Sequence, residues 1–458
     1  SEDSTMKATR ILIALSVLVS GACNFDIADP NNPGPISNDP SPSQVGAAVT
    51  GIVIASRAPV GGWNLISGIL GREAYRFDGS EPRFISELLH GPLDPGDGFG
   101  GGQWAGEYSA IRSANQLIDV IGTATAYSAG DQDAVRGFAE TMQAYQFLMV
   151  LMARSQDSIP VAVDQPLTAA PAPFVSNDSA YGYVSGLLDA ADGHLASGGG
   201  SFPAGVALPS GFAGFDTPAT FRKFNRALKA AVEVYSGSLG CGATCYTTAK
   251  TLLENGSTFV DTSASADPSA GVYFNFSTNP GDAANPLFQN PQTGENHVNP
   301  RVVDSADTNA SGGIDQRVTA KVVSRPTQTT DSLTSAYGWI RYGSANATIP
   351  IIKNEELVLL RAEANNALGN GLLAAADVNY IRVTSGGVLP IAGLGAQTQA
   401  QILGAILHER WYSLLYEGHR WYDLRRTGRL GAFLLDRPSD QVFSTLPIPL
   451  GEVQARQP

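Results

Sequence analysis

The sequence predicts an all-α fold in which helix pairs joined by short turns form the scaffold. Apolar residues recur at three-to-four spacing in many segments, and no alternating run of comparable length predicts a sheet. Small residues also gather in the segments 354–368 and 372–382, where two helices must approach closely, as they do in tetratricopeptide-like repeats. The helices are expected at 44–56, 104–121, 133–154, 179–195, 220–235, 246–253, 354–368, 372–382 and 399–416.

Start and stop signals support several of these helices. Pro218 follows Thr217 in the first turn of one segment, where its missing N–H is tolerated. Asn370 and Gly371 separate the segments 354–368 and 372–382, which indicates a helical hairpin.

Two irregular regions interrupt the helical pattern, at 198–216 and 256–348. Both are rich in Gly, Pro, Ser, Asn and Asp, and loops of this length in a compact chain are usually functional or disordered. We therefore expect one helical domain over 44–458, with a ligand-binding half built from these long loops.

The N-terminus has the three-part plan of a secretory signal. Lys7 and Arg10 precede an apolar run at 11–19, and small residues follow before Cys23. Residues 1–22 are thus a predicted signal peptide, and Cys23 stands where a bacterial lipoprotein is acylated. An ordinary signal peptide with an incidental cysteine is the alternative. The Pro-, Asn- and Ser-rich residues 23–43 are typical of a tether.

Charge and cysteine content narrow the possible partners. The net charge of -13 would repel a nucleic-acid backbone, so nucleic acid is not an expected partner. Cys241 and Cys245 lie close together in an exported chain, which favours a disulfide over free thiols. Two thiolates without a nearby histidine do not make a zinc site, and no other metal site is predicted.

A charged cluster near the C-terminus raises the question of catalysis. Glu409 and Glu417 are expected two turns apart on one helix face, with Ser413 between them, as a possible glycosidase pair. Arginines crowd the same stretch, and a guanidinium neighbour lowers a carboxyl pKa, which suits fixed ion pairs and not a general acid. The sequence also lacks nucleophile-elbow, zinc-protease and phosphate-loop motifs, so we predict no catalytic residues and no cofactor.

Aromatic residues in apparent loops are the strongest candidates for ligand binding. Trp63 follows two glycines, Trp104 follows a glycine-rich stretch, and Trp339 lies among other aromatics. Exposed rings beside polar side chains suit the apolar faces and hydroxyl rims of sugars, although packing in the core is the alternative for each ring. The candidate stacking rings are Trp63, Trp104 and Trp339, and the candidate polar contacts are Arg72, Asp78 and Asn115.

An ordered series of motifs resembles the SusD/RagB family of nutrient-binding outer-membrane lipoproteins. The most specific match is Lys353 to Ala364 followed by Ala376 to Arg382, with Glu409 to Arg426 and Leu446 to Pro449 after it. The other matching segments are Trp104 to Asn115, Gly137 to Phe147, Ser158 to Pro160 and Asp315 to Arg317.

The resemblance implies four tetratricopeptide-like helix pairs that support an irregular, ligand-binding half. It also implies an outer-membrane anchor through acylated Cys23, and a lid-like association with a SusC-like TonB-dependent transporter. Family members capture oligosaccharides or peptides without altering them.

We therefore predict a non-enzymatic, cell-surface glycan-binding lipoprotein that delivers its ligand to such a transporter. A peptide-binding family member and a self-assembling structural surface protein are the alternatives, and a secreted glycosidase is the least supported one.

Overall fold

The computed structural model describes residues 36–154, 159–166 and 168–457. From residue 38 onward the chain forms one compact unit. The predicted signal peptide, Cys23 and most of the predicted tether lie outside the described residues.

Long helices form the first half of this unit, and their starting residues follow from local capping. Ser128 accepts a hydrogen bond from the Asp131 N–H while the Asp131 side chain accepts one from the Ser128 N–H, a capping box that starts α6. Thr217 and Thr398 begin α8 and α14 in the same way. The principal helices are α2 (Pro42–Arg57), α3 (Val60–Leu70), α5 (Ala105–Ile121), α6 (Ala129–Ala153), α7 (Asn177–Ser197), α8 (Pro218–Ser236), α9 (Ala243–Glu254), α12 (Asn354–Ala367), α13 (Gly371–Ile381), α14 (Gln399–Ser413) and α15 (Arg420–Arg426).

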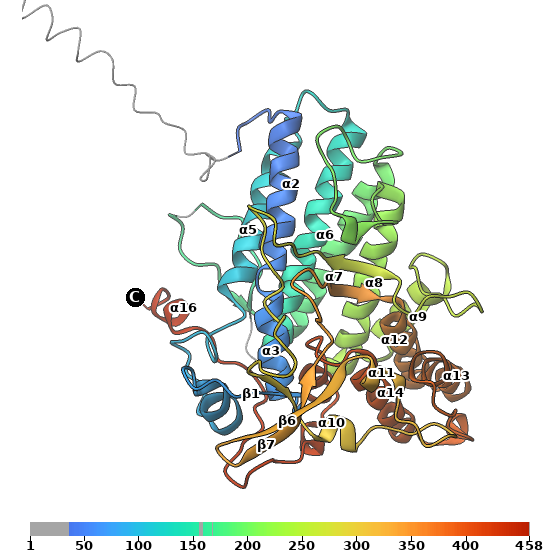
Figure 1. Cartoon of the computed structure of the whole chain (residues 1–458). Helices are drawn as coiled ribbons and strands as arrows, with labels where there is room; N and C mark the ends of the chain where they lie inside the picture. The colour runs from blue at the N-terminus through green and yellow to red at the C-terminus, as the bar shows by residue number, and fades with distance from the viewer. Residues whose placement is uncertain (1–35, 155–158, 167, 458) are drawn as a thin grey trace, which may run out of the picture. The chain divides into compact units, whose positions relative to one another are not determined.

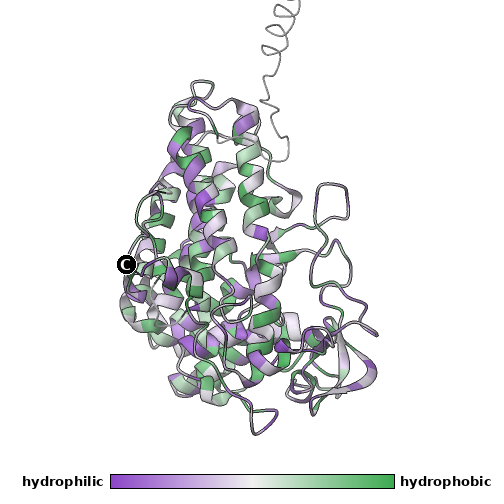
Figure 2. Cartoon of the chain, turned by 90° about the vertical axis from the view of Figure 1, so that its left-hand side faces the viewer, coloured by the Kyte–Doolittle hydropathy of each residue, from purple (hydrophilic) through white to green (hydrophobic). Residues whose placement is uncertain are grey.

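Consecutive helices pack side by side, as the predicted helix pairs require. α5 contacts α6, α6 contacts α7, α7 contacts α8 and α8 contacts α9 (Figure 1). Gly137 permits the close approach of α6 to α7, because a Cβ there would lie 2.6 Å from the Leu195 Cγ. Figure 2 shows hydrophilic and hydrophobic residues interspersed along these helices, as amphipathic helices demand.

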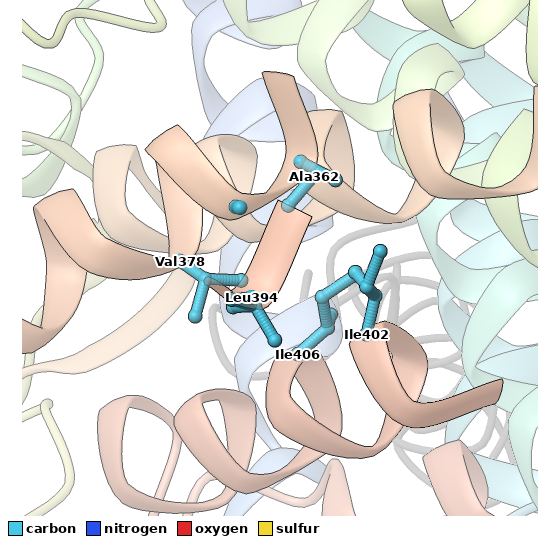
Figure 3. Packing of buried hydrophobic residues seen from close by; sticks show 7 residues of the cluster. Ala362, Val378, Leu394, Ile402 and Ile406 are labelled. Carbon is cyan, nitrogen blue, oxygen red and sulfur yellow. The ribbon is translucent and has the colours of Figure 1, made fainter. Parts of the chain in front are cut away.

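The helices α12, α13 and α14 enclose a small core of their own. Small alanines face branched side chains there, so the helices approach closely, as the sequence predicts (Figure 3). The core residues are Ala362, Ala374, Ala375, Val378, Leu394, Ile402 and Ile406.

The prediction of an all-α fold is wrong for the second irregular region, which contains strands. A four-stranded antiparallel sheet has the order β1-β5-β7-β6, and two separate two-stranded sheets pair β2 with β3 and β4 with β8. The strands are β1 (Ala74–Arg76), β2 (Ile159–Pro160), β3 (Phe174–Val175), β4 (Gly271–Phe274), β5 (Asn296–Val298), β6 (Val322–Thr330), β7 (Leu333–Trp339) and β8 (Ile349–Lys353). Short helices accompany them: α4 (Arg83–Ile85), α10 (Arg301–Asp304), α11 (Gln316–Thr319) and α16 (Leu450–Gln454).

The sequence does not reveal the strands, because most of them are short and the longest, β6, is mostly exposed. β6 exposes most of its threonine-rich second half, so its residues show little apolar alternation. β6 and β7 are joined by Asp331 and Ser332, both at positive φ (49° and 64°), as the mirror-image turn of a two-residue hairpin requires. The strands β5 and β1, which lie before this hairpin in the sequence, complete the four-stranded sheet.

Two further sequence-based expectations meet the structure here. The disulfide between Cys241 and Cys245 is confirmed. Trp63 was expected in a loop, but it belongs to α3, which is almost wholly buried. The segment Pro42–Leu70 is long and apolar enough to cross a membrane. Most of its large apolar side chains nevertheless pack inside the protein, with Ile54 as an exposed exception, and α2 contacts α5, so we assign the segment to the core.

Candidate functional site

The three candidate stacking tryptophans are buried, so the expectation that they lie exposed in loops is wrong. Trp63, Trp104 and Trp339 are only 1%, 6% and 6% exposed. Trp63 belongs to α3, and the first of the two glycines before it, Gly61, serves close packing and not a flexible loop. A Cβ on Gly61 would lie 2.3 Å from the Pro286 Cγ, so only glycine fits there.

Two of these rings enclose the turn at 414–418, which follows α14. Trp339 stacks on Tyr416 with ring centroids 4.3 Å apart and planes 10° apart. On the other side, a Cβ added to Gly418 would lie 2.4 Å from the Trp63 Nε1. The two indoles therefore stabilise this turn and present no open ring face to a ligand.

Arg72 and Asp78, two candidate polar contacts, are engaged within the protein. Arg72 donates from Nη2 to the Gln441 carbonyl at 2.7 Å. Asp78 accepts from the Ser80 hydroxyl at 2.7 Å and from the Arg76 Nη2 at 2.9 Å. The Ser80 and Arg76 hydrogen bonds lower the pKa of Asp78. Arg72 thus ties the distant Gln441 segment to the start of β1, whereas Asp78 fixes the backbone turn that follows β1.

Glu417 lies in a dense ion-pair cluster, although not on the expected helix face. α14 ends at Ser413, so Glu417 is in the following turn and the predicted two-turn helical spacing to Glu409 is wrong. Its carboxylate accepts from Arg341 at 2.8 Å and from Lys353 at 2.9 Å. Burial favours a raised pKa, but Lys353, Arg341 and Lys321 outweigh it and lower the pKa of Glu417. The predicted structural ion pairing is thus observed, but its cations come from distant segments and not from the arginines of the same stretch.

Glu409 is likewise paired, and its surroundings do not suit a metal ion. It accepts from Arg317 at 2.7 Å and from Arg382 at 2.6 Å. Glu409, Asp307 and His408 bring possible ligand atoms within 4.8 Å of one another. However, Arg382 also donates to Asp307 at 2.7 Å, so a guanidinium already neutralises both carboxylates.

The one candidate polar contact at a surface hollow is Asn115, on α5. Three side chains of this helix, at the spacing of one face, donate to backbone carbonyls of the segment 159–165. Tyr108 donates to residue 160 at 2.7 Å, Arg112 to residue 165 at 3.1 Å, and Asn115 to residue 163 at 3.2 Å. The Trp104 ring packs on Tyr108, 4.9 Å between centroids, and so supports the same face. The segment is therefore held along α5.

This segment and the helices α5, α6 and α7 enclose a hollow of about 290 Å³, which we call the α5–α7 hollow. Its lining combines one exposed aromatic ring with amide and carboxylate groups. The polar and aromatic lining residues are Asn115, Asp119, Glu140, Gln143, Asp164 and Tyr183.

Tyr183 supplies the ring of the α5–α7 hollow. It is 39% exposed and is held edge-on by Phe147, with centroids 5.5 Å apart. Burial raises the pKa of Tyr183, and Asp164 and Glu140 raise it further, so its hydroxyl stays protonated and able to donate.

Gln143 supplies an amide at the base of the hollow. It is 4% exposed, and its Nε2 donates to the Asn115 Oδ1. Among the described residues its Oε1 has no hydrogen-bond partner, so this acceptor is available to a ligand.

Glu140 lies beside Gln143 on the wall of the hollow. Its Oε2 lies 2.7 Å from the His194 Nδ1. Burial raises the pKa of Glu140, although the His194 hydrogen bond opposes the shift. The carboxyl group is thus anchored by His194 while the residue lines the hollow.

The structure does not bring the six candidate residues to one site. Asn115 lines the α5–α7 hollow and Trp104 supports it, whereas the other four lie elsewhere in the protein. Sequence analysis missed Tyr183, although the helical period offered a signal. Positions 181, 184, 188, 191 and 195 form the buried face of α7, and residue 183 falls outside it.

Comparisons with known proteins give a consistent result. Residues 254–442 match the model of the SusD family. SusD-like protein P38 of Formosa agariphila is 31% identical over 142 residues, which span 29% of this chain and 28% of that protein. The match to this curated relative thus covers less than a third of its length.

Solved structures extend the likeness of fold along the chain. Surface glycan-binding protein A from Bacteroides uniformis has a TM-score of 0.67 at 15% identity, covering 91% of this chain and 98% of its own. A laminarin-binding SusD-like protein has a TM-score of 0.64 at 17% identity, covering 90% and 97%. At these identities the likeness concerns the fold alone.

Proposed function

We propose, because residues 254–442 match the model of the SusD family, that the protein binds glycans at a bacterial cell surface without altering them. The solved relatives support the ligand class, since one is described as surface glycan-binding and another as laminarin-binding. The proposal extends to delivery of the glycan to a SusC-like TonB-dependent transporter, as the family resemblance implies.

The observation that carries the proposal is the composition of the α5–α7 hollow. An exposed ring can cover the apolar face of a sugar, while neighbouring amides and carboxylates hydrogen-bond its hydroxyls. Binding sites commonly combine such a ring with a few convergent polar groups. The best acid–base candidates elsewhere, Glu409 and Glu417, are paired with cations, which supports binding without chemistry.

Asn115 and Tyr183 are therefore the proposed contacts. Trp63 and Trp339 are not proposed as contacts. Both rings pack against the turn at 414–418, so replacing either would disturb that turn and not a ligand contact.

The proposed location is the outer membrane, through a lipid on Cys23. The signal at 1–22 and the tether at 23–43 support it on sequence grounds. Mass spectrometry of the mature protein tests the anchor, because acylation of Cys23 adds a defined mass to the new N-terminal residue.

Calorimetry with laminarihexaose and peptides of similar length tests the ligand class. We expect the oligosaccharide to bind and Tyr183→Ala to weaken it about three- to tenfold, as loss of one ring contact predicts. Phe288→Ala is the matched control, because Phe288 is similarly exposed (41%) but does not line the hollow. Equal losses in the two variants, or binding of peptides alone, would contradict the proposal.

A further inference from the structure

We propose that the α5–α7 hollow selects glycans by charge, admitting uncharged oligosaccharides and excluding those that carry carboxylate or sulfate groups. This inference rests on the proposed function and assigns the selection to Asp119 and Asp164, with Glu140 in support.

The charge of the lining is one-sided. Three carboxylate residues line the hollow: Asp119 on α5, Glu140 on α6 and Asp164 in the segment 159–165. Within the described part of the chain, no lysine, arginine or histidine is among its lining residues. Asp119 and Asp164 are exposed, so they meet an incoming ligand first.

The neighbouring cations are directed elsewhere. Arg112 donates from Nη1 to the backbone carbonyl of Gln165, and His194 pairs with Glu140 from outside the hollow. Arg136, one helical turn before Glu140, acts on its carboxylate electrostatically but does not line the hollow. None of these groups is placed to receive an anionic substituent inside it.

Carboxylates treat neutral and acidic sugars differently. An ionised carboxylate only accepts hydrogen bonds, and sugar hydroxyls donate them, so a neutral sugar gains contacts at Asp119 and Asp164. A carboxylate or sulfate on the sugar offers no proton to these groups and meets their like charge at short range. Like-charge juxtaposition of this kind is a common means of rejecting a wrong ligand.

The test uses two ligands that differ only at C6: laminarihexaose and the same hexasaccharide whose C6 hydroxymethyl groups are oxidised to the carboxylates of glucuronate. At about 0.15 M ionic strength we expect the oxidised form to bind wild type about tenfold more weakly. The double variant Asp119→Asn and Asp164→Asn should reduce this ratio to about threefold or less. The control Asp178→Asn, on α7 outside the hollow, should leave the ratio unchanged.

The ratio of the two affinities is the readout, so a general loss of affinity or folding in the variant cannot imitate the effect. Equal binding of both forms to wild type would leave glycan binding intact and overturn the charge selection. An unequal ratio that the double variant does not change would overturn the roles of Asp119 and Asp164. If neither form binds wild type or variant, the proposed glycan binding at this hollow is refuted, and the selection with it.

Discussion

Replacing Glu417 by glutamine should strongly destabilise the protein. The Glu417 side chain is 2% exposed and compensates Arg341 at 2.8 Å, Lys353 at 2.9 Å and Lys321 at 3.9 Å. Glutamine keeps the size but removes the charge, which leaves buried cations without their shared carboxylate. Loss of one partner from a buried ion pair costs about 3–5 kcal/mol.

This free energy converts to a measurable change in melting temperature. Unfolding entropy is about 2.1 cal/mol/K per residue, or about 0.9 kcal/mol/K for a unit of about 420 residues. Scanning calorimetry at neutral pH should therefore show Glu417→Gln melting about 3–6 °C below wild type. Glu254→Gln is the control, since Glu254 pairs with Lys250 at 2.5 Å on the surface (36% and 28% exposed) and should cost less than about 1 kcal/mol.

Acid provides a second check on the same cluster. Because the folded-state pKa of Glu417 lies below its ordinary 4.5, its contribution is present above that pH and is lost as the pH falls below it. The gap in melting temperature between wild type and Glu417→Gln should thus narrow in acid. A variant that melts within about 1 °C of wild type at neutral pH would refute the reasoning.

The structure also predicts how substitutions at Glu73 and at Gly137 change the stability of the protein. Burial raises the pKa of Glu73 to about 8, so wild type loses stability as the pH rises from 4.5 to 8. Glu73→Gln keeps an acceptor for the Tyr416 N–H. In urea titrations its free energy of unfolding should exceed that of wild type by about 1 kcal/mol or more at pH 8, but not at pH 4. A difference that does not change with pH would contradict the raised pKa of Glu73. Gly137→Ala should lower the stability of the fold by about 1–3 kcal/mol, because its Cβ would lie 2.6 Å from Leu195. Gly182→Ala in α7 should instead raise the stability by up to about 1 kcal/mol, because a Cβ there meets nothing within 4 Å. Equal effects of the two alanines in thermal melts would show that the helix spacing is not as tight as described.

The helical scaffold could be predicted because its signals are local. Apolar spacing, a proline in a first turn, and a glycine between two segments act within a few residues, and the observed helices α5, α8 and α13 begin within two residues of their predicted starts. The motif series likewise indicated a resemblance to the SusD/RagB family, and residues 254–442 match the model of the SusD family.

The strands and the ligand hollow depended on residues far apart in the chain. β1 pairs with β5 more than 200 residues away, so neither short strand carries enough pattern to reveal itself. Trp63 looked like a loop residue after two glycines, but Pro286 packs against the first of them and the ring is buried. Asn115 meets Gln143 and the segment 159–165 only after α5 and α6 have packed.

The amino-acid sequence thus determined most of the long helices, the pairing of the two neighbouring cysteines and the resemblance to the SusD/RagB family, but not α3. Only the tertiary structure decided which aromatic rings are exposed and which polar groups face a common hollow. The physical reason is that helix formation depends on neighbours within one or two turns, whereas burial of a side chain depends on whatever distant segment packs over it.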